Sequence, residues 1–134
     1  PARKRNGRFL IEALRDNPLV LHLPHDSEDR QNSFWWAPFV LDTNRLKVPM
    51  KQFRKAMEAE GVPVYGALWP ELYKEKAFID YMKARGIYDP DVECRTARWL
   101  AERTISLFTH PVYETEHMEK YIEAFNKVAK AYTK

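Results

Sequence analysis

Residues 34–65 read FWWAPFVLDTNRLKVPMKQFRKAMEAEGVPVY, and this stretch decides the fold. Aromatic and β-branched residues dominate 33–41, which is typical of a buried strand. Pro38 must then face an edge or a bulge, because proline has no backbone donor. The next segment, 49–60, has apolar residues three and four positions apart and predicts a helix, and 62–65 is again β-prone. The stretch therefore predicts a strand, a helix and a second strand in succession.

The rest of the chain continues this mixture of strands and helices. Further helices are predicted at 10–17, 71–85, 97–104 and 115–132, and further strands at 19–23 and 105–108. The last helix has four turns of amphipathic pattern, with Thr115 as its expected N-cap. The elements interleave without the regular alternation of a doubly wound sheet. We therefore predict the α+β class, as a small, mostly antiparallel sheet with helices packed on one face.

The size and composition fit one folded domain. The chain has 134 residues, of which 45% are hydrophobic and 31% charged, far from the composition of disordered chains. The longest apolar run, 34–41, contains Pro38 and is much shorter than the roughly 20 residues of a membrane span. We expect a single domain over 1–134 and no membrane segment.

The net charge of +3 comes from the N-terminus. Arg3, Lys4, Arg5 and Arg8 form a basic arm, and the remaining 18 basic and 19 acidic residues leave a net charge of −1. Such a body lacks the positive field that steers proteins to nucleic acid. Nucleic-acid binding is therefore not expected. A basic-arm binder would instead show an affinity that falls steeply with salt.

The titratable residues form no familiar catalytic or metal motif. His22 and His25 are spaced for two metal ligands, but a structural zinc site needs four and the single cysteine, Cys94, is far along the chain. Cys94 with His110 or His117 is the only conceivable thiol–imidazole nucleophile, and a buried structural cysteine is the favoured interpretation. No metal site is predicted. The lone cysteine and the absence of a signal sequence predict a cytoplasmic protein.

One segment stands out as a binding candidate. Residues 65–73, YGALWPELY, contain three aromatic residues together with glycine and proline, directly after a predicted strand. Loops of this kind on a rigid scaffold are often binding surfaces. The composition is equally consistent with a structural role, in which Trp69 and Tyr73 fill a small satellite core. Both interpretations stay open.

Several segments, in their order and spacing, match a known family. The matching stretches are 5–8, 34–41, 60–64, 69–78, 94–102, 105–107 and 115–128. They resemble the C-terminal small domain of the DegT/DnrJ/StrS-type aminotransferases, which use pyridoxal phosphate (PLP) to aminate sugars and cyclitols. The GVPV sequence at 61–64 is most similar to the branch that handles cyclitols and amino-sugar antibiotic precursors.

This resemblance implies that the chain is a fragment whose large domain, with the lysine that binds PLP, precedes residue 1. The full-length parent would be a homodimeric, PLP-dependent aminotransferase that takes a keto sugar or cyclitol and an amino-acid amino donor. The chain alone would bind no cofactor and would not catalyse. It would close the active site and contribute substrate recognition through five residues: Tyr65, Trp69, Glu71, Tyr73 and His110.

A second interpretation is a non-catalytic interaction or regulatory module with the same fold. The two interpretations differ in what precedes residue 1. The enzyme requires some 230 or more upstream residues, in keeping with two domains, whereas the module requires none.

Overall fold

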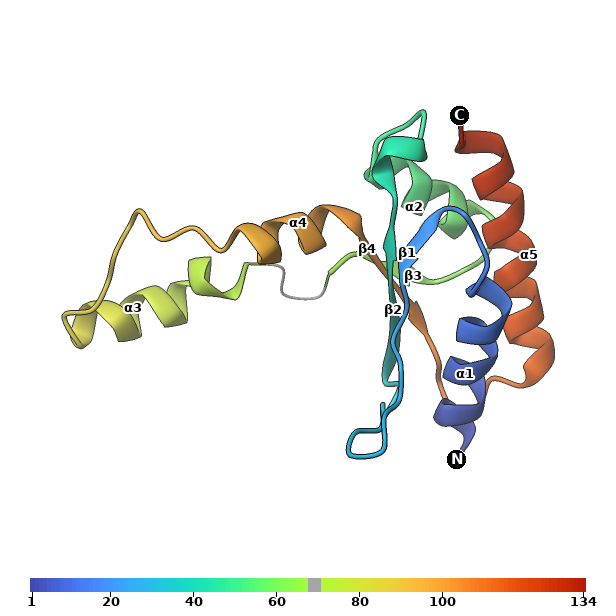
Figure 1. Cartoon of the computed structure of the whole chain (residues 1–134), viewed down its shortest axis with the longest axis horizontal. Helices are drawn as coiled ribbons and strands as arrows, with labels where there is room; N and C mark the ends of the chain where they lie inside the picture. The colour runs from blue at the N-terminus through green and yellow to red at the C-terminus, as the bar shows by residue number, and fades with distance from the viewer. Residues whose placement is uncertain (68–70) are drawn as a thin grey trace.

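The computed structural model describes residues 1–67 and 71–134 (Figure 1). The elements, in chain order, are α1 (Ala2–Leu14), β1 (Val20–His22), β2 (Trp36–Leu41), the 3-10 helix η1 (Thr43–Arg45), α2 (Met50–Ala59), β3 (Val64–Tyr65), the 3-10 helix η2 (Leu72–Lys74), α3 (Lys76–Ala84), α4 (Arg95–Arg103), β4 (Thr104–Phe108) and α5 (Thr115–Tyr132). The described strands form one sheet in the order β1-β2-β4-β3, and each neighbouring pair is antiparallel. The predicted α+β class with an antiparallel sheet is therefore confirmed.

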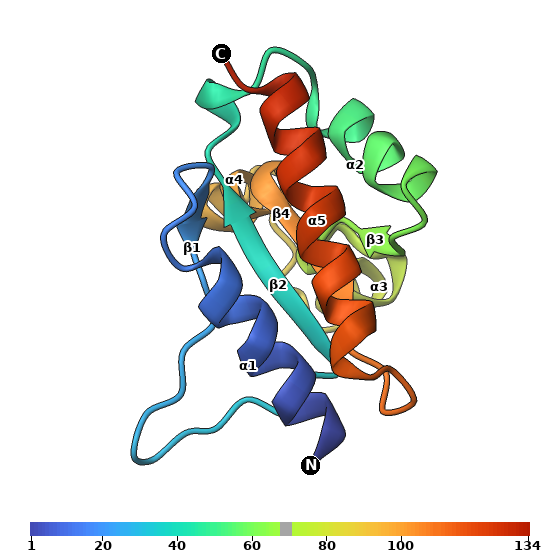
Figure 2. The ribbon, with the colours of Figure 1, turned by 90° about the vertical axis from the view of Figure 1, so that its right-hand side faces the viewer.

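Helices α1, α2 and α5 lie over one face of the sheet, as Figure 2 shows. Successive side chains of a strand point to opposite faces, so alternate residues of the central strands β2 and β4 point toward these helices. The inward-facing residues are completely buried: Ala37, Phe39, Leu41, Ile105 and Leu107. Phe53 of α2 and Phe125 of α5 are also completely buried, with ring centroids 5.7 Å apart. The core therefore lies between the sheet and these three helices.

Pro38 lies in the middle of β2 without breaking a ladder hydrogen bond. Asp42 donates its N–H to the carbonyl of Leu19, on the β1 side of the strand. The nitrogen of Pro38 faces that same side, because hydrogen-bonding direction alternates along a strand. Within the described chain, β1 pairs with β2 only at Val40 and Leu41. The missing donor of Pro38 thus faces an unpaired stretch of edge, as the sequence required.

Several boundaries differ from the sequence predictions. The first helix begins at Ala2 rather than near residue 10, so the predicted basic arm is helical. Segment 71–85 is not one helix but η2 followed by α3, because Glu75 between them is extended, with φ −67° and ψ 137°. The residue that caps α5 is Glu114 and not Thr115. The backbone N–H of Glu114 donates to His117 Nδ1 at 3.1 Å.

Residues 71–103 form an arm that projects away from the sheet (Figure 1). No residue of α3 or α4 is buried, and Phe78, Tyr81 and Ile87 are 45%, 54% and 65% exposed. Cys94 immediately precedes α4 and is exposed, so the prediction of a buried cysteine is wrong. The physical reason is that the arm contributes nothing to the hydrophobic core. Across the two described stretches of chain, the helices are too short or too polar to span a membrane.

Phe34 explains why β2 starts late and why position 7 is glycine. Its φ is 52°, in the left-handed region that bulky residues rarely adopt. Strand geometry therefore begins at Trp36 and not at the predicted Ser33. The Phe34 ring is 3% exposed and packs on α1 at Gly7, where an added Cβ would lie 2.3 Å from the ring.

We expect Gly7→Ala to destabilise the chain by about 1–3 kcal/mol, the usual cost of overpacking. Helix propensity alone would make the alanine variant more stable by about 1 kcal/mol. A loss of stability would therefore show that the added methyl group clashes with Phe34. Urea unfolding measures it. Gly66→Ala is the matched control, because its added Cβ first meets the flexible end of the Arg54 side chain, at 3.1 Å. Equal stability of the two variants would show that Phe34 is not fixed against α1.

Candidate functional site

The face of the sheet opposite the helices carries aromatic rings from three strands. Trp36 of β2 contacts both Tyr65 of β3 and Phe108 of β4, with ring centroids 4.6 Å apart in each pair. Their side chains point away from the helices because they alternate with the inward-facing residues of the same strands. Tyr65 is 50% exposed and the neighbouring Trp35 is 52% exposed. We call Trp36, Tyr65 and Phe108 the aromatic row.

The aromatic row continues into the loop after β4. The His110 ring lies 5.4 Å from the Phe108 ring, and Tyr113 stacks on His117 at 5.4 Å. His110 Nδ1 accepts the backbone N–H of Val112 at 3.3 Å. In a neutral imidazole with Nδ1 as acceptor, Nε2 carries the proton. His110 therefore offers a donor at the end of the row.

Four consecutive residues of α1, Arg5–Arg8, hold the loops at this end of the sheet, and we call them the clamp. Asn6 is completely buried, and its Nδ2 donates to the carbonyls of His110 at 3.2 Å and Tyr113 at 2.9 Å. Arg5 donates to the Tyr113 carbonyl at 2.7 Å. The clamp thus fixes the backbone on both sides of the turn that carries His110.

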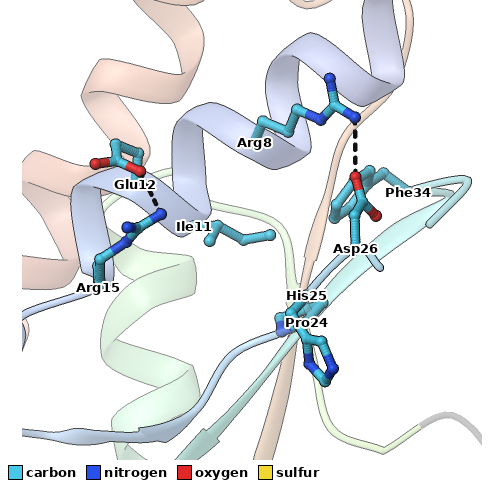
Figure 3. Close-up of a pocket in the computed structure, with 8 residues that line it drawn as sticks. All are labelled: Arg8, Ile11, Glu12, Arg15, Pro24, His25, Asp26 and Phe34. Atoms are coloured by element: carbon cyan, nitrogen blue, oxygen red, sulfur yellow. Dashed lines mark hydrogen bonds and ion pairs between the residues drawn. The ribbon is translucent and has the colours of Figure 1, made fainter. Parts of the chain in front are cut away.

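The clamp also holds the loop between β1 and β2. Arg8 donates to Asp26 at 2.9 Å, drawn as a dashed line in Figure 3. Asp26 also accepts the backbone N–H and the Nδ2 of Asn32, both at 2.8 Å. These bonds, led by the Asn32 backbone and followed by Arg8, hold the pKa of Asp26 well below its usual range. An ionised Asp26 therefore ties this loop to α1, beside the packing of Phe34 on Gly7.

We expect Asn6→Ala to destabilise the chain by about 1–3 kcal/mol, because the His110 carbonyl loses its donor and the Tyr113 carbonyl keeps only Arg5. Amide hydrogen exchange around residues 110–113 should also become faster. Asn126→Ala is the control, since Asn126 accepts a single exposed hydrogen bond from Asn17 at 3.2 Å. Exchange around 110–113 that is the same in both variants would contradict the positioning role of Asn6.

A hollow of about 360 Å³ lies between α1 and the loop that precedes β2 (Figure 3). Its charged rim is already paired, Arg8 with Asp26 and Arg15 with Glu12 at 2.6 Å. None of the described residues that were predicted to bind substrate lines this hollow. It is therefore not the candidate site.

His22 and His25, the pair spaced for two metal ligands, have different neighbours. The His22 ring lies 6.3 Å from Trp99, whereas His25 Nε2 lies 3.2 Å from Arg30 Nη2. Among residues 1–67 and 71–134, no three histidine, cysteine, aspartate or glutamate side chains come together as metal ligands.

The predicted site residues fall into two clusters. Tyr65 and His110 are connected through the aromatic row. Glu71 and Tyr73 lie at the base of the arm, where the Tyr73 hydroxyl donates to Glu71 Oε1 at 2.6 Å. Trp69 lies outside the described residues. The structure therefore groups Tyr65 with His110, and Glu71 with Tyr73.

Glu71 anchors the second cluster. Its Oε1 also contacts Lys74 Nζ at 2.8 Å and Arg98 Nε at 3.5 Å. Lys74 first, and then Tyr73, lower the pKa of Glu71 from 4.5 to about 2. Because Arg98 belongs to α4, the ionised carboxylate links η2 to α4 at the base of the arm.

The lowered pKa of Glu71 predicts acid sensitivity of the arm. The ionised Glu71 carboxylate stabilises the arm at pH values above its ordinary pKa of 4.5. This stabilisation is lost as the pH falls from 4.5 toward 2. We expect the protection of the α4 amides against hydrogen exchange to fall between pH 4.5 and 2 in the wild-type chain. In Glu71→Gln this protection should not change with pH over the same range. Glu75→Gln, which changes an exposed neighbouring carboxylate, should keep the wild-type profile. A Glu71→Gln profile identical to wild type would refute the anchor.

Sequence reasoning did not single out Trp36, Phe108 or Arg98. Both faces of β2 carry large apolar side chains, so period-two alternation does not tell which face stays open. The neighbouring tryptophans at 35 and 36 were the available signal, since one of them must point away from the core. Arg98 meets Glu71 from 27 positions away, and no local pattern predicts such a contact.

Comparisons with known proteins agree with this architecture. No protein-family model and no curated protein matches the chain. Among solved structures, an aminotransferase from Psychrobacter cryohalolentis matches 97% of this chain with a TM-score of 0.80 and 19% identity, over 34% of its own length. Helicobacter pylori PseC, an aminotransferase of pseudoaminic acid biosynthesis, matches 97% with a TM-score of 0.75 and 14% identity, over 32% of its length.

A third structure, of the E. coli GDP-4-keto-6-deoxy-D-mannose-3-dehydratase with bound hydrated PLP, matches 92% of the chain. Its TM-score is 0.72 at 14% identity, over 30% of its length. The chain thus spans about a third of the length of the structures it matches. At these identities the likeness establishes the fold. The resemblance seen in the sequence is therefore confirmed at that level: the chain has the α+β fold of one third of these aminotransferase-like enzymes.

Proposed function

We propose that this chain is the C-terminal small domain of a PLP-dependent aminotransferase of the DegT/DnrJ/StrS type that acts on a keto sugar or cyclitol. The supporting observation is the fold, which matches two aminotransferases and a GDP-4-keto-6-deoxy-D-mannose-3-dehydratase over 92–97% of this chain but only 30–34% of theirs. In this proposal the large domain precedes residue 1. The parent is a cytoplasmic homodimer that takes its amino group from an amino acid.

In this proposal the chain does not itself hold the cofactor. PLP chemistry needs a neutral lysine amine for covalent attachment, and the cofactor then supplies the electron sink. Lys74, in the second cluster, is paired with Glu71 at 2.8 Å, and this hydrogen bond raises its pKa. A protonated amine is not a nucleophile. We therefore place cofactor binding in the upstream domain and derive no chemical step from this chain.

The aromatic row supports a role in substrate recognition. The half-exposed Tyr65 presents a ring face and a hydroxyl, and His110 adds a donor at the other end of the row. Ring faces pack on the C–H surface of sugars and cyclitols, while nearby polar groups orient the hydroxyls. In the proposal, Tyr65 and His110 contact the substrate from the aromatic row. Trp69, Glu71 and Tyr73 are also proposed to contact it, and Glu71 in addition holds the arm in place.

The exposed arm supports closure against the upstream domain. A nine-residue helix such as α3 is marginal on its own in water. Its exposed Phe78 and Tyr81 form an apolar hollow together with Ala77. Exposed apolar patches of this kind mark contacts with another surface. An interaction module without enzymatic function would use the same patch, so cofactor binding must separate the two interpretations.

We expect the isolated chain, mixed with PLP, to show no stoichiometric visible absorption and no borohydride-trappable adduct on one lysine. The same chain joined to its upstream polypeptide should bind one PLP per subunit and transfer an amino group to a keto sugar or cyclitol. Lys74→Arg tests whether such an adduct forms at Lys74. A stoichiometric adduct at any one lysine of this chain would contradict the assignment. An upstream polypeptide that neither binds PLP nor transfers an amino group would favour the interaction module.

A further inference from the structure

Trp36 holds a hydrogen-bond donor that nothing in the described chain accepts. Its Nε1 is buried and has no hydrogen-bond partner within residues 1–67 and 71–134. The other two side-chain atoms of this kind belong to α1 and α5, at Arg3 and Tyr121. Of these three atoms, the Trp36 Nε1 is therefore the one that lies on the face of the sheet opposite the helices. A buried donor without a partner costs free energy, so an acceptor in the complete assembly would recover it.

Aromatic rings pack around Trp36. Its ring contacts Tyr65 and Phe108 at 4.6 Å and Trp35 at 6.2 Å. The cation–ring contacts of the described chain involve Tyr73, Tyr81, Tyr88 and Trp99 instead, and so lie outside the aromatic row. With no cation over its rings in the described chain, the row suits a neutral acceptor with C–H faces. A polyhydroxylated ring has both.

Tyr65 is the half-exposed neighbour of Trp36 in the aromatic row. Tyr65 ends β3, a strand of two residues at the edge of the sheet, and is 50% exposed. Its ring lies against Trp36 at an angle of 74°. A half-exposed side chain on a short edge strand can change rotamer without disturbing the core. Rotation of Tyr65 would open one side of the Trp36 ring and leave a ring face beside it.

We infer that Trp36 is a substrate-binding residue that donates its Nε1–H to a hydroxyl oxygen of a neutral polyhydroxylated ring, which packs against Tyr65. This inference rests on the proposed function and adds to it the residue that orients the ring. The competing acceptor is a backbone carbonyl of a covering protein segment.

Titration with myo-inositol and with methyl β-D-glucopyranoside tests the inference independently of catalysis. The indole N–H signals of the 15N-labelled chain, alone and joined to its upstream polypeptide, report the binding. We expect a saturable shift of the Trp36 signal with at least one probe, whereas the exposed Trp35 signal stays in place. Trp36→Phe should weaken the binding about 2- to 10-fold, the range for one neutral hydrogen bond. Trp35→Phe should leave the affinity unchanged.

The outcomes separate the inference from the proposed function. A Trp36 signal that ignores both probes in both proteins overturns the inference, even in an active aminotransferase. A signal that moves when the upstream polypeptide is joined, but not with the probes, assigns the donor to a protein carbonyl and also overturns it. A probe-dependent shift in a polypeptide without PLP binding supports the inference and rejects the aminotransferase.

In an active enzyme, kinetics give a second measurement. Trp36→Phe should raise KM for the keto substrate about 2- to 10-fold and leave the half-reaction with the amino donor unchanged. Equal losses in both half-reactions would indicate a structural role and count against the inference.

Discussion

The buried amide of Asn6 makes the contact on which the rest of the structure depends. Its two hydrogen bonds reach the carbonyls of His110 and Tyr113, 104 and 107 residues away. They join the first helix to the turn between the last strand and the last helix. Because Asn6 is completely buried, its amide needs these two acceptors, and the helix must begin early enough to place it beside them. This explains why α1 includes the basic residues of the N-terminus.

Asn6 is part of the clamp, Arg5–Arg8, which connects two loops at one end of the sheet: the loop before β2 and the loop after β4. Gly7 accommodates Phe34, whose left-handed backbone turns the chain into β2 at Trp36. Asn6 holds the carbonyl of His110 at the far end of the aromatic row. The aromatic row is thus positioned by contacts made on the other side of the sheet. A substitution in the clamp would therefore shift the aromatic row, although the clamp residues do not contact its rings.

The two faces of the sheet have different tasks. Three helices cover one face and form the core, while the other face carries the tryptophan, tyrosine and phenylalanine side chains of the aromatic row and is covered in part by α4, which packs against β2. The arm also leaves apolar side chains exposed, since neither α3 nor α4 contains a buried residue. Open aromatic and apolar surface of this extent is what a part of a larger enzyme would present to its other domain and to a substrate.

The sequence by itself determined the element types, their order and the α+β class. Period-two and helical spacings, together with Pro38 and Gly61, are local signals that act within a few residues. The boundaries at Ala2, Trp36 and Glu114 depend on partners far along the chain, so local patterns placed them wrongly. Only the tertiary structure decided which face of the sheet stays open and which charged groups meet. The physical reason is that burial and hydrogen bonding between distant residues, such as Asn6 with His110 or Glu71 with Arg98, leave no periodic trace in the sequence.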